Sequence, residues 1–163
     1  RLARVGARVV VSDADAGRAR SVAGELGIEA VAADVVYDTE CDVFAPCAVG
    51  GVLNERTVPR LRCRIVAGSA NNQLESESDA ERLAERGVLY VPDFIINAGG
   101  AVAHGILEFL RWPAEEVEPR VRRIGGTVAE ILAEAGDGDP QPVAVARARR
   151  YIAEHRRANG GPA

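Results

Sequence analysis

Short apolar runs alternate with segments of helical periodicity through the first hundred residues. The runs are rich in β-branched residues and end at glycine, proline or acidic positions, which is typical of buried strands. They predict strands over residues 8–13, 29–33, 42–47, 64–68 and 88–91. The intervening segments predict helices over residues 14–26, 54–61 and 78–86, the second with Asn54 as its N-cap. This alternation indicates βα units and a mainly parallel sheet.

Helical periodicity dominates the rest of the chain. It predicts helices over residues 101–111, 114–135 and 143–157, with Pro140 and Pro142 separating the last two. No repeat or linker indicates a second domain. We therefore expect one doubly wound α/β domain with C-terminal helices over residues 1–157, and a disordered tail over residues 158–163.

Composition narrows the class of protein. With 47% hydrophobic and 27% charged residues, and no apolar run near the ~20 residues that span a bilayer, we expect no membrane segment. The net charge of -4 lacks the basic field of a nucleic-acid binder. Three cysteines without metal or redox spacing favour a cytoplasmic protein with no metal site. All 20 basic residues are arginines.

Asp13 closes the first predicted strand, where ligands of doubly wound sheets bind. A carboxylate there can accept hydrogen bonds from both hydroxyls of an adenosine ribose and would repel a 2′-phosphate, which favours NAD over NADP. The alternative is that Asp13 caps the helix predicted from Ala14, a role that Asp15 could share.

The glycine-rich turn of a Rossmann-type fold should precede such an acid by ~20 residues, and the sequence does not contain it. Residues 1–7 read like the last turn of a helix, so we expect a fragment that lacks the first strand and this turn. In the usual order 3-2-1-4-5-6 that strand lies in the middle of the sheet. The strands around Val9 and Val43 should therefore have no neighbour between them.

Carboxamides follow two successive strands: Asn71, Asn72 and Gln73 after one, and Asn97 after the next. These groups donate and accept without charge, as a nicotinamide amide and ribose hydroxyls require. Each could instead be an ordinary turn residue. Gly99 and Gly100 allow a close backbone approach to a ligand, or simply begin a helix.

Three long motifs now carry a resemblance to a known family. They are VFAPCAVGG from Val43, VAGSANNQL from Val66 and YVPDFIINAGG from Tyr90. In this order and spacing they resemble the Glu/Leu/Phe/Val dehydrogenases, closest to the leucine, valine and phenylalanine enzymes, over residues 8–157. The resemblance implies reversible oxidative deamination of an L-amino acid, branched-chain or aromatic, to a 2-oxo acid and ammonia, with hydride transfer to NAD. It also implies a homo-oligomer.

The resemblance also assigns roles to residues. Asp13 is similar to the acid that binds the adenosine ribose, and Asn71 to a nicotinamide-side contact. Asn97 is similar to the residue that reaches the nicotinamide ribose and the substrate, and the adjoining Ala98 and Gly99 would lie on the substrate side. The wall of the cofactor cleft would consist of Ala45, Pro46, Cys47 and Ala48. We expect Cys47 to line the cleft without acting as a nucleophile, and neither His104 nor His155 to be catalytic.

The catalytic groups of the family are lysines and an aspartate of a separate N-terminal domain. This chain has no lysine, so we expect no catalytic residue in it and no activity by itself. The parent enzyme would carry out the chemistry. The alternatives are a non-catalytic nucleotide-binding or interaction module derived from such an enzyme, or a fragment of another NAD enzyme with the same fold.

Overall fold

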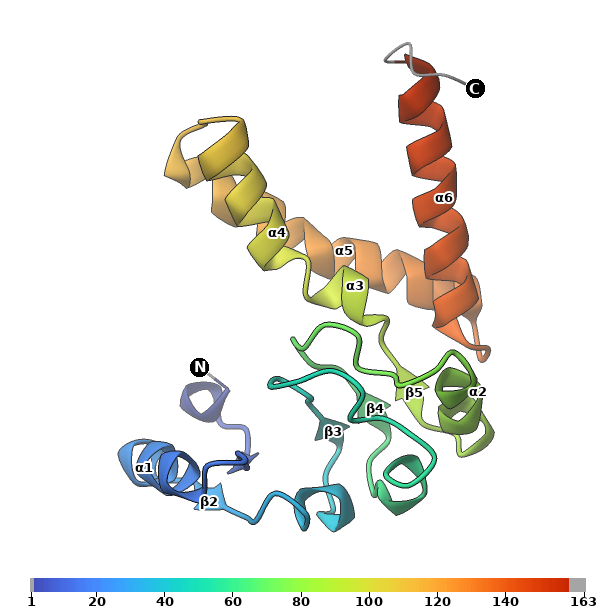
Figure 1. Ribbon diagram of the computed structural model, residues 1–163. Helices are drawn as coiled ribbons and strands as arrows, with labels where there is room; N and C mark the ends of the chain where they lie inside the picture. The colour runs from blue at the N-terminus through green and yellow to red at the C-terminus, as the bar shows by residue number, and fades with distance from the viewer. Residues whose placement is uncertain (1, 159–163) are drawn as a thin grey trace.

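The computed structural model describes residues 2–158 and contains two parallel sheets (Figure 1). One sheet pairs β1 (Val10–Val11) with β2 (Glu29–Ala30). The other has the order β3-β4-β5, formed by β3 (Val43–Phe44), β4 (Ile65–Val66) and β5 (Leu89–Tyr90). The mixed architecture with parallel strands confirms the α/β prediction.

The division into two sheets matches the expected absence of a middle strand. Within residues 2–158, β1 pairs only with β2, and β3 only with β4. Val43 lies opposite Ile65, and Ile65 opposite Leu89, so the three strands of the larger sheet end at one level. Their carboxyl ends therefore present their loops at the same edge.

Each strand is shorter than its apolar run predicts. The run over residues 42–47 forms a strand only at Val43–Phe44, and the run over residues 8–13 only at Val10–Val11. An apolar β-branched run indicates a buried segment with an extended backbone. A β-strand also needs a neighbouring strand with which its backbone exchanges hydrogen bonds. Only two residues of each run are paired in this way, both in β4, which has a neighbour on each side, and in β1 and β3, which have one in the described chain.

The hydrophobic core lies under the three-stranded sheet. Val66 and Tyr90 contribute from the strands, Leu83 from α2 (Ser78–Glu85), and Leu53 from the loop after β3. Leu53, Val66 and Leu83 are completely buried. The core therefore supports the strands whose carboxyl ends carry the predicted site.

The first helix, α1 (Ala16–Leu26), begins two residues later than predicted. Asp15 is its N-cap, because its Oδ1 accepts hydrogen bonds from the backbone N–H groups of Gly17 and Arg18 at 2.8 and 3.1 Å. The alternative role of Asp13 as the cap is therefore wrong. Asp13 Oδ1 instead accepts from the N–H of Asp15 at 2.8 Å, which fixes the turn before the helix.

We expect Asp15→Ala to lower the free energy of unfolding by about 1 kcal/mol, because two N–H groups lose their acceptor. Urea denaturation of the purified chain measures the change. Asp15→Asn keeps a capping oxygen and should stay near the wild-type value. Equal losses in the two variants would contradict the capping role.

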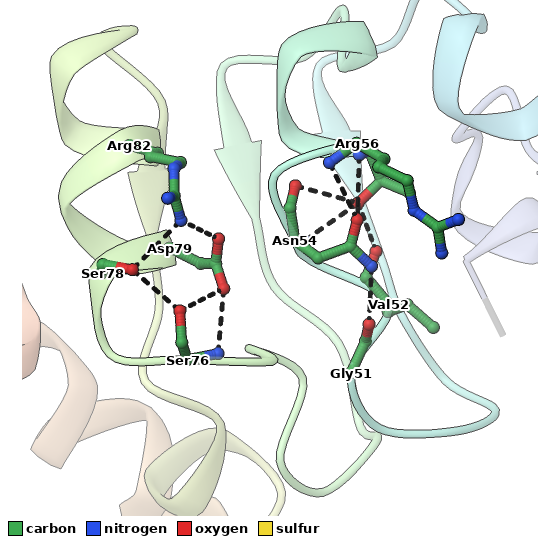
Figure 2. A network of polar contacts seen from close by, with 9 residues as sticks. Gly51, Val52, Asn54, Arg56, Ser76, Ser78, Asp79 and Arg82 are labelled. Carbon is green, nitrogen blue, oxygen red and sulfur yellow. Dashed lines mark hydrogen bonds and ion pairs between the residues drawn. The ribbon is translucent and has the colours of Figure 1, made fainter.

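The helix predicted over residues 54–61 is wrong. Asn54 does cap a turn, since its Oδ1 accepts from the N–H groups of Arg56 and Thr57, both at 3.1 Å (Figure 2). Only a 3-10 turn, Val58–Arg60, follows. Pro59 has no N–H to donate and is tolerated only in a first turn, so the helix does not continue.

The C-terminal helices α3 (Asp93–Ile96), α4 (Gly99–His104), α5 (Val117–Ala135) and α6 (Pro140–Ala158) follow β5. A π-helical turn, Gly105–Phe109, extends α4. Figure 1 shows α3 and α4 beside α5, whereas α6 leaves α5 and projects from the molecule.

Two boundaries in this region differ from the prediction. Pro140 and Pro142 lie in the first turn of α6 and do not separate it from α5, because proline is compatible with the start of a helix. Gly136 ends α5. The predicted tail begins within α6 at Ala158, and its remaining residues lie outside the described part of the chain.

Across residues 2–158, none of the helices combines the length and the apolar character needed to cross a membrane. The same residues contain no group of three or more His, Cys, Asp or Glu side chains that could hold a metal ion.

Candidate nucleotide site

The loops after β3, β4 and β5 are joined by backbone hydrogen bonds. Gly51 N donates to Asn72 O at 2.8 Å, and Leu53 N donates to Gln73 O at 3.0 Å. Ala70 N donates to Pro46 O, also at 3.0 Å. The segment after β3 thus continues beside the segment after β4, and the two form one surface at the carboxyl edge of the sheet.

Gly68 allows these two loops to approach closely. A Cβ atom at position 68 would lie 2.0 Å from the Pro46 carbonyl oxygen and 2.5 Å from the Pro46 nitrogen. Both are backbone atoms, which cannot turn aside as a flexible side chain could. Only glycine fits where the ends of β3 and β4 meet.

Asn71 and Asn97 converge at this edge although they are far apart in the sequence. Asn97 Nδ2 donates to Asn71 Oδ1 at 2.7 Å and to the Ala70 carbonyl at 3.2 Å. A carbonyl only accepts hydrogen bonds, so the atom of Asn97 that faces Ala70 must be the NH2 group. This contact fixes the orientation of the Asn97 side chain.

The pair leaves one acceptor and one donor free for a ligand. Both protons of Asn97 Nδ2 are used, whereas its Oδ1 has no hydrogen-bond partner among residues 2–158. Asn71 Oδ1 accepts from Asn97, and its Nδ2 has no partner within the same residues. Asn71 is exposed and Asn97 half-buried. Together they can bind an uncharged group that both donates and accepts.

A hollow of about 550 Å³ lies beside this pair. Its lining includes Asn71, Asn72, Asn97, Ala98 and Ser69. Asp93 is the one charged residue among the described residues that line it. The hollow therefore offers no arginine to a phosphate and is better suited to a neutral or cationic ring and sugar hydroxyls.

Two buried polar residues, Tyr90 and Asp93, lie at the end of β5, and the second of them lines the hollow. Burial, together with the nearby Asp93 carboxylate, raises the pKa of Tyr90, so its phenol stays neutral at physiological pH. Asp93 itself accepts hydrogen bonds from the N–H groups of Gln73 at 2.9 Å and Phe94 at 2.6 Å.

Asp13 lies half-buried after β1, in the other sheet. Its Oδ1 is used by the turn to Asp15, and its Oδ2 has no partner among the described residues. No hydrogen bond or ion pair within residues 2–158 joins it to the loops after β3, β4 and β5. Asp13 is thus not hydrogen-bonded to the Asn71–Asn97 pair within the described residues.

The other predicted site residues occupy varied surroundings. Ala45, Cys47 and Ala48 are exposed after β3, whereas Pro46 is buried against Gly68. Ala98 lines the hollow. Gly99 begins α4, and a Cβ atom there would contact Val121 of α5 at 3.5 Å, so this glycine faces α5.

The histidines have local packing partners. His104 ends α4, with its ring edge against Phe109 at a centroid distance of 5.2 Å. His155 stacks on Tyr151 within α6 at 3.9 Å. Neither lies among the residues that line the hollow.

Sequence reasoning missed two buried residues. The sequence places Gln73 beside Asn71 and Asn72 as one of three carboxamides, yet its side chain is completely buried, and Asp93 appears only within the motif YVPDFIINAGG. The position of Asp93 directly after a strand, next to Pro92, was the one available signal. Nothing in the sequence distinguishes the inward Gln73 from the outward Asn71 and Asn72.

The chain is similar to a family of known enzymes over nearly its whole length. The family model for Glutamate/Leucine/Phenylalanine/Valine dehydrogenase matches residues 8–158. Leucine dehydrogenase from Thermoactinomyces intermedius is 41% identical over 143 residues, which cover 87% of this chain and 39% of that protein. The chain thus spans about two fifths of the length of this relative.

Solved structures agree. The crystal structure of L-tryptophan dehydrogenase from Nostoc punctiforme superposes with a TM-score of 0.81 at 37% identity, covering 97% of this chain and 47% of that one. Hetero-hexameric glutamate dehydrogenase from Thermus thermophilus gives 0.66 at 25% identity, covering 99% of this chain and 51% of the other. On the family match and these likenesses, the chain belongs to the Glutamate/Leucine/Phenylalanine/Valine dehydrogenase family.

Proposed function

We propose that the hollow beside Asn71 and Asn97 binds the nicotinamide end of NAD. The observation that carries this proposal is the hydrogen-bonded pair at adjacent strand ends, which leaves Asn97 Oδ1 and Asn71 Nδ2 free. A nicotinamide carboxamide or a ribose hydroxyl both donates and accepts, so either group matches this set. When bound, NAD supplies the acceptor for a hydride.

The whole protein would then catalyse oxidative deamination of an L-amino acid to a 2-oxo acid and ammonia. Leucine and tryptophan dehydrogenases are among the relatives, which supports a branched-chain or aromatic substrate. Asn97, Ala98 and Gly99 would lie on the substrate side of the nicotinamide. The three free cysteines support our proposal of a cytoplasmic location.

Asp13 would bind the adenosine ribose of the same cofactor. Its Oδ2 is free among the described residues, so one carboxylate oxygen can accept from a hydroxyl while the other holds the turn. A carboxylate in this place favours NAD over NADP. Ala45, Pro46, Cys47 and Ala48 would form the wall between the two ends of the cofactor.

The pyrophosphate has no comparable site in residues 2–158. We propose that residues 1–157 belong to a dinucleotide-binding domain in which a further parallel strand pairs with both β1 and β3. The free sides of these two strands support this arrangement. The glycine-rich turn that binds the phosphates would follow that strand.

The catalytic groups would also lie outside the 163-residue chain, which contains no lysine. We therefore propose that this chain alone does not turn over an amino acid. We propose that the assembled enzyme is a homo-oligomer. The Thermus glutamate dehydrogenase is described as a hetero-hexamer, which supports an oligomeric assembly but not the identity of its subunits.

Nicotinamide mononucleotide and adenosine monophosphate, titrated separately, test the two ends of the proposed site. In NMR spectra of the 163-residue chain, the first should shift the side-chain amides of Asn71 and Asn97, and the second the backbone amide of Asp13. Asn97→Ala should weaken the mononucleotide about tenfold, the equivalent of one lost hydrogen bond with its partner left unpaired.

Gln141→Ala, a carboxamide in α6 outside the lining of the hollow, is the matched control and should leave the affinity unchanged. Equal affinities of Asn97→Ala and the wild type would refute the nicotinamide role. Binding of NAD by the whole protein without turnover of any amino acid would instead favour a non-catalytic nucleotide-binding module.

A further inference from the structure

Two buried residues are linked by hydrogen bonds to the Asn71–Asn97 pair and its backbone. Gln73 is 0% exposed and Asp93 is 8% exposed. Gln73 belongs to the loop after β4, and Asp93 begins α3 after β5. Neither residue belongs to the proposed set of ligand contacts, yet both hydrogen-bond with the backbone around that set.

The contacts form a closed ring. Gln73 Nε2 donates to the carbonyls of Gly68 at 2.8 Å and Ala70 at 3.0 Å, and Asn97 Nδ2 donates to the same Ala70 carbonyl. Gln73 N donates to Asp93 Oδ2 at 2.9 Å, and the Asp93 carbonyl accepts from Asn97 N at the same distance. The ring therefore runs through Asn97, Ala70, Gln73 and Asp93.

We propose that Gln73 and Asp93 are positioning residues, which hold Asn97 and Asn71 so that one free acceptor and one free donor face the hollow. Gln73 fixes the Ala70 carbonyl, to which the Asn97 side chain is bound. Asp93 fixes the backbone of both Gln73 and Asn97, because its carboxylate accepts from Gln73 N and its carbonyl accepts from Asn97 N. The value of this alignment for cofactor binding rests on the proposed function of the pair.

The chemistry of Gln73 argues against a role in packing alone. Its Oε1 is buried and has no hydrogen-bond partner among the described residues. A buried acceptor without a partner costs stability, and a leucine or methionine would fill the same volume without that cost. The glutamine is thus useful for its two donated hydrogen bonds, which determine where the Ala70 carbonyl lies.

The carboxylate of Asp93 has a similarly specific role. Its two oxygens face the N–H groups of Gln73 and Phe94. In Asp93→Asn, an NH2 group must replace one acceptor and face an N–H donor, because a carboxamide has a single oxygen. The substitution keeps the shape of the side chain, but a single oxygen can no longer hold both N–H groups, so either the contact with Gln73 or the contact with Phe94 is lost.

Asp79 provides a matched control. It is 1% exposed and, like Asp93, accepts hydrogen bonds from a nearby loop, at 2.9 Å from Ser76 N and 2.8 Å from Ser76 Oγ (Figure 2). It also pairs with Arg82 at 2.6 Å within α2. Among residues 2–158 no hydrogen bond joins it to the ring, so Asp79→Asn disturbs a buried carboxylate without reaching Asn97.

The experiment compares Asp93→Asn, Gln73→Met and Asp79→Asn in the 163-residue chain. The first readout is the set of side-chain amide resonances of Asn71 and Asn97, and the second is the affinity for nicotinamide mononucleotide. We expect both ring variants to shift the resonances and to weaken the mononucleotide about tenfold. Asp79→Asn should lower the unfolding midpoint and leave both readouts at wild-type values.

Resonances that stay in place in both ring variants, or that move equally in Asp79→Asn, would overturn the inference. If the ring variants do not fold, hydrogen exchange in the wild-type chain tests whether the ring is rigid. The Gln73 backbone N–H and side-chain amide should exchange as slowly as core amides, and fast exchange would exclude a rigid ring.

The two proposals fail in different ways. If Asn97→Ala leaves the mononucleotide affinity unchanged while the ring variants still shift the amide resonances, the nicotinamide role is wrong and the positioning role stands. If Asn97→Ala weakens binding but the ring variants change neither readout, the positioning role is wrong and the site stands.

Discussion

Gly68→Ala is expected to lower the free energy of unfolding by about 3 kcal/mol, and the unfolding midpoint by on the order of 10 °C. The new Cβ atom would lie 2.0 Å from the Pro46 carbonyl oxygen, so the ends of β3 and β4 must separate. The same movement would break the hydrogen bond from Ala70 N to Pro46 O. Thermal and urea unfolding of the purified chain measure the loss.

Gly24→Ala is the matched control for this prediction. Gly24 lies inside α1 with no atom within 4 Å of its would-be Cβ, and alanine is the better helix former. This variant should therefore be more stable than the wild type by roughly 0.5–1 kcal/mol. A Gly68→Ala protein as stable as the wild type would show that the two loops do not pack as described.

Leu53→Ala is expected to cost about 2–5 kcal/mol of unfolding free energy. Leu53 is completely buried in the core under the sheet. Its backbone also joins the loops, since Leu53 N donates to Gln73 O and Glu75 N donates to Leu53 O at 2.9 Å. A cavity here would loosen the segment that carries Asn71, so the affinity for nicotinamide mononucleotide should fall together with stability.

Val49→Ala is the matched control, because Val49 lies in the same loop as Leu53 but is exposed. Val49 follows β3 as Leu53 does, but it is 66% exposed. Its truncation should change the free energy of unfolding by no more than about 0.5 kcal/mol. Similar losses in Val49→Ala and Leu53→Ala would contradict the assigned core.

The sequence was sufficient for the order of the strands along the chain and for the gap between β1 and β3. Apolar β-branched runs separated by helical periodicity indicated the parallel strands, and the missing glycine-rich turn indicated that β1 and β3 would not be neighbours. The first signal is local, because the alternation of apolar runs with helical periodicity can be read from adjacent residues. The second used the usual strand order of a doubly wound sheet, in which the missing strand lies between these two. The positions of Asn71 and Asn97 at adjacent strand ends followed from the same pattern.

The roles of individual residues depended on local geometry that the hydrophobic pattern does not contain. Asp15 rather than Asp13 caps α1, because the two residues differ in the direction of their carboxylates and not in their type. Pro59 limited a predicted helix to one 3-10 turn, although the apolar spacing around it was helical. Local periodicity does not record either effect.

Three consecutive carboxamides show most clearly what cannot be predicted from the sequence. Asn71, Asn72 and Gln73 are chemically alike in the sequence, yet two lie at the surface and the third is buried. The direction of each side chain depends on the carbonyls of Gly68 and Ala70 and on a carboxylate 20 residues away. Such contacts exist only once the strand ends are packed together, so the tertiary structure alone determines which amide faces a ligand and which one holds it in place.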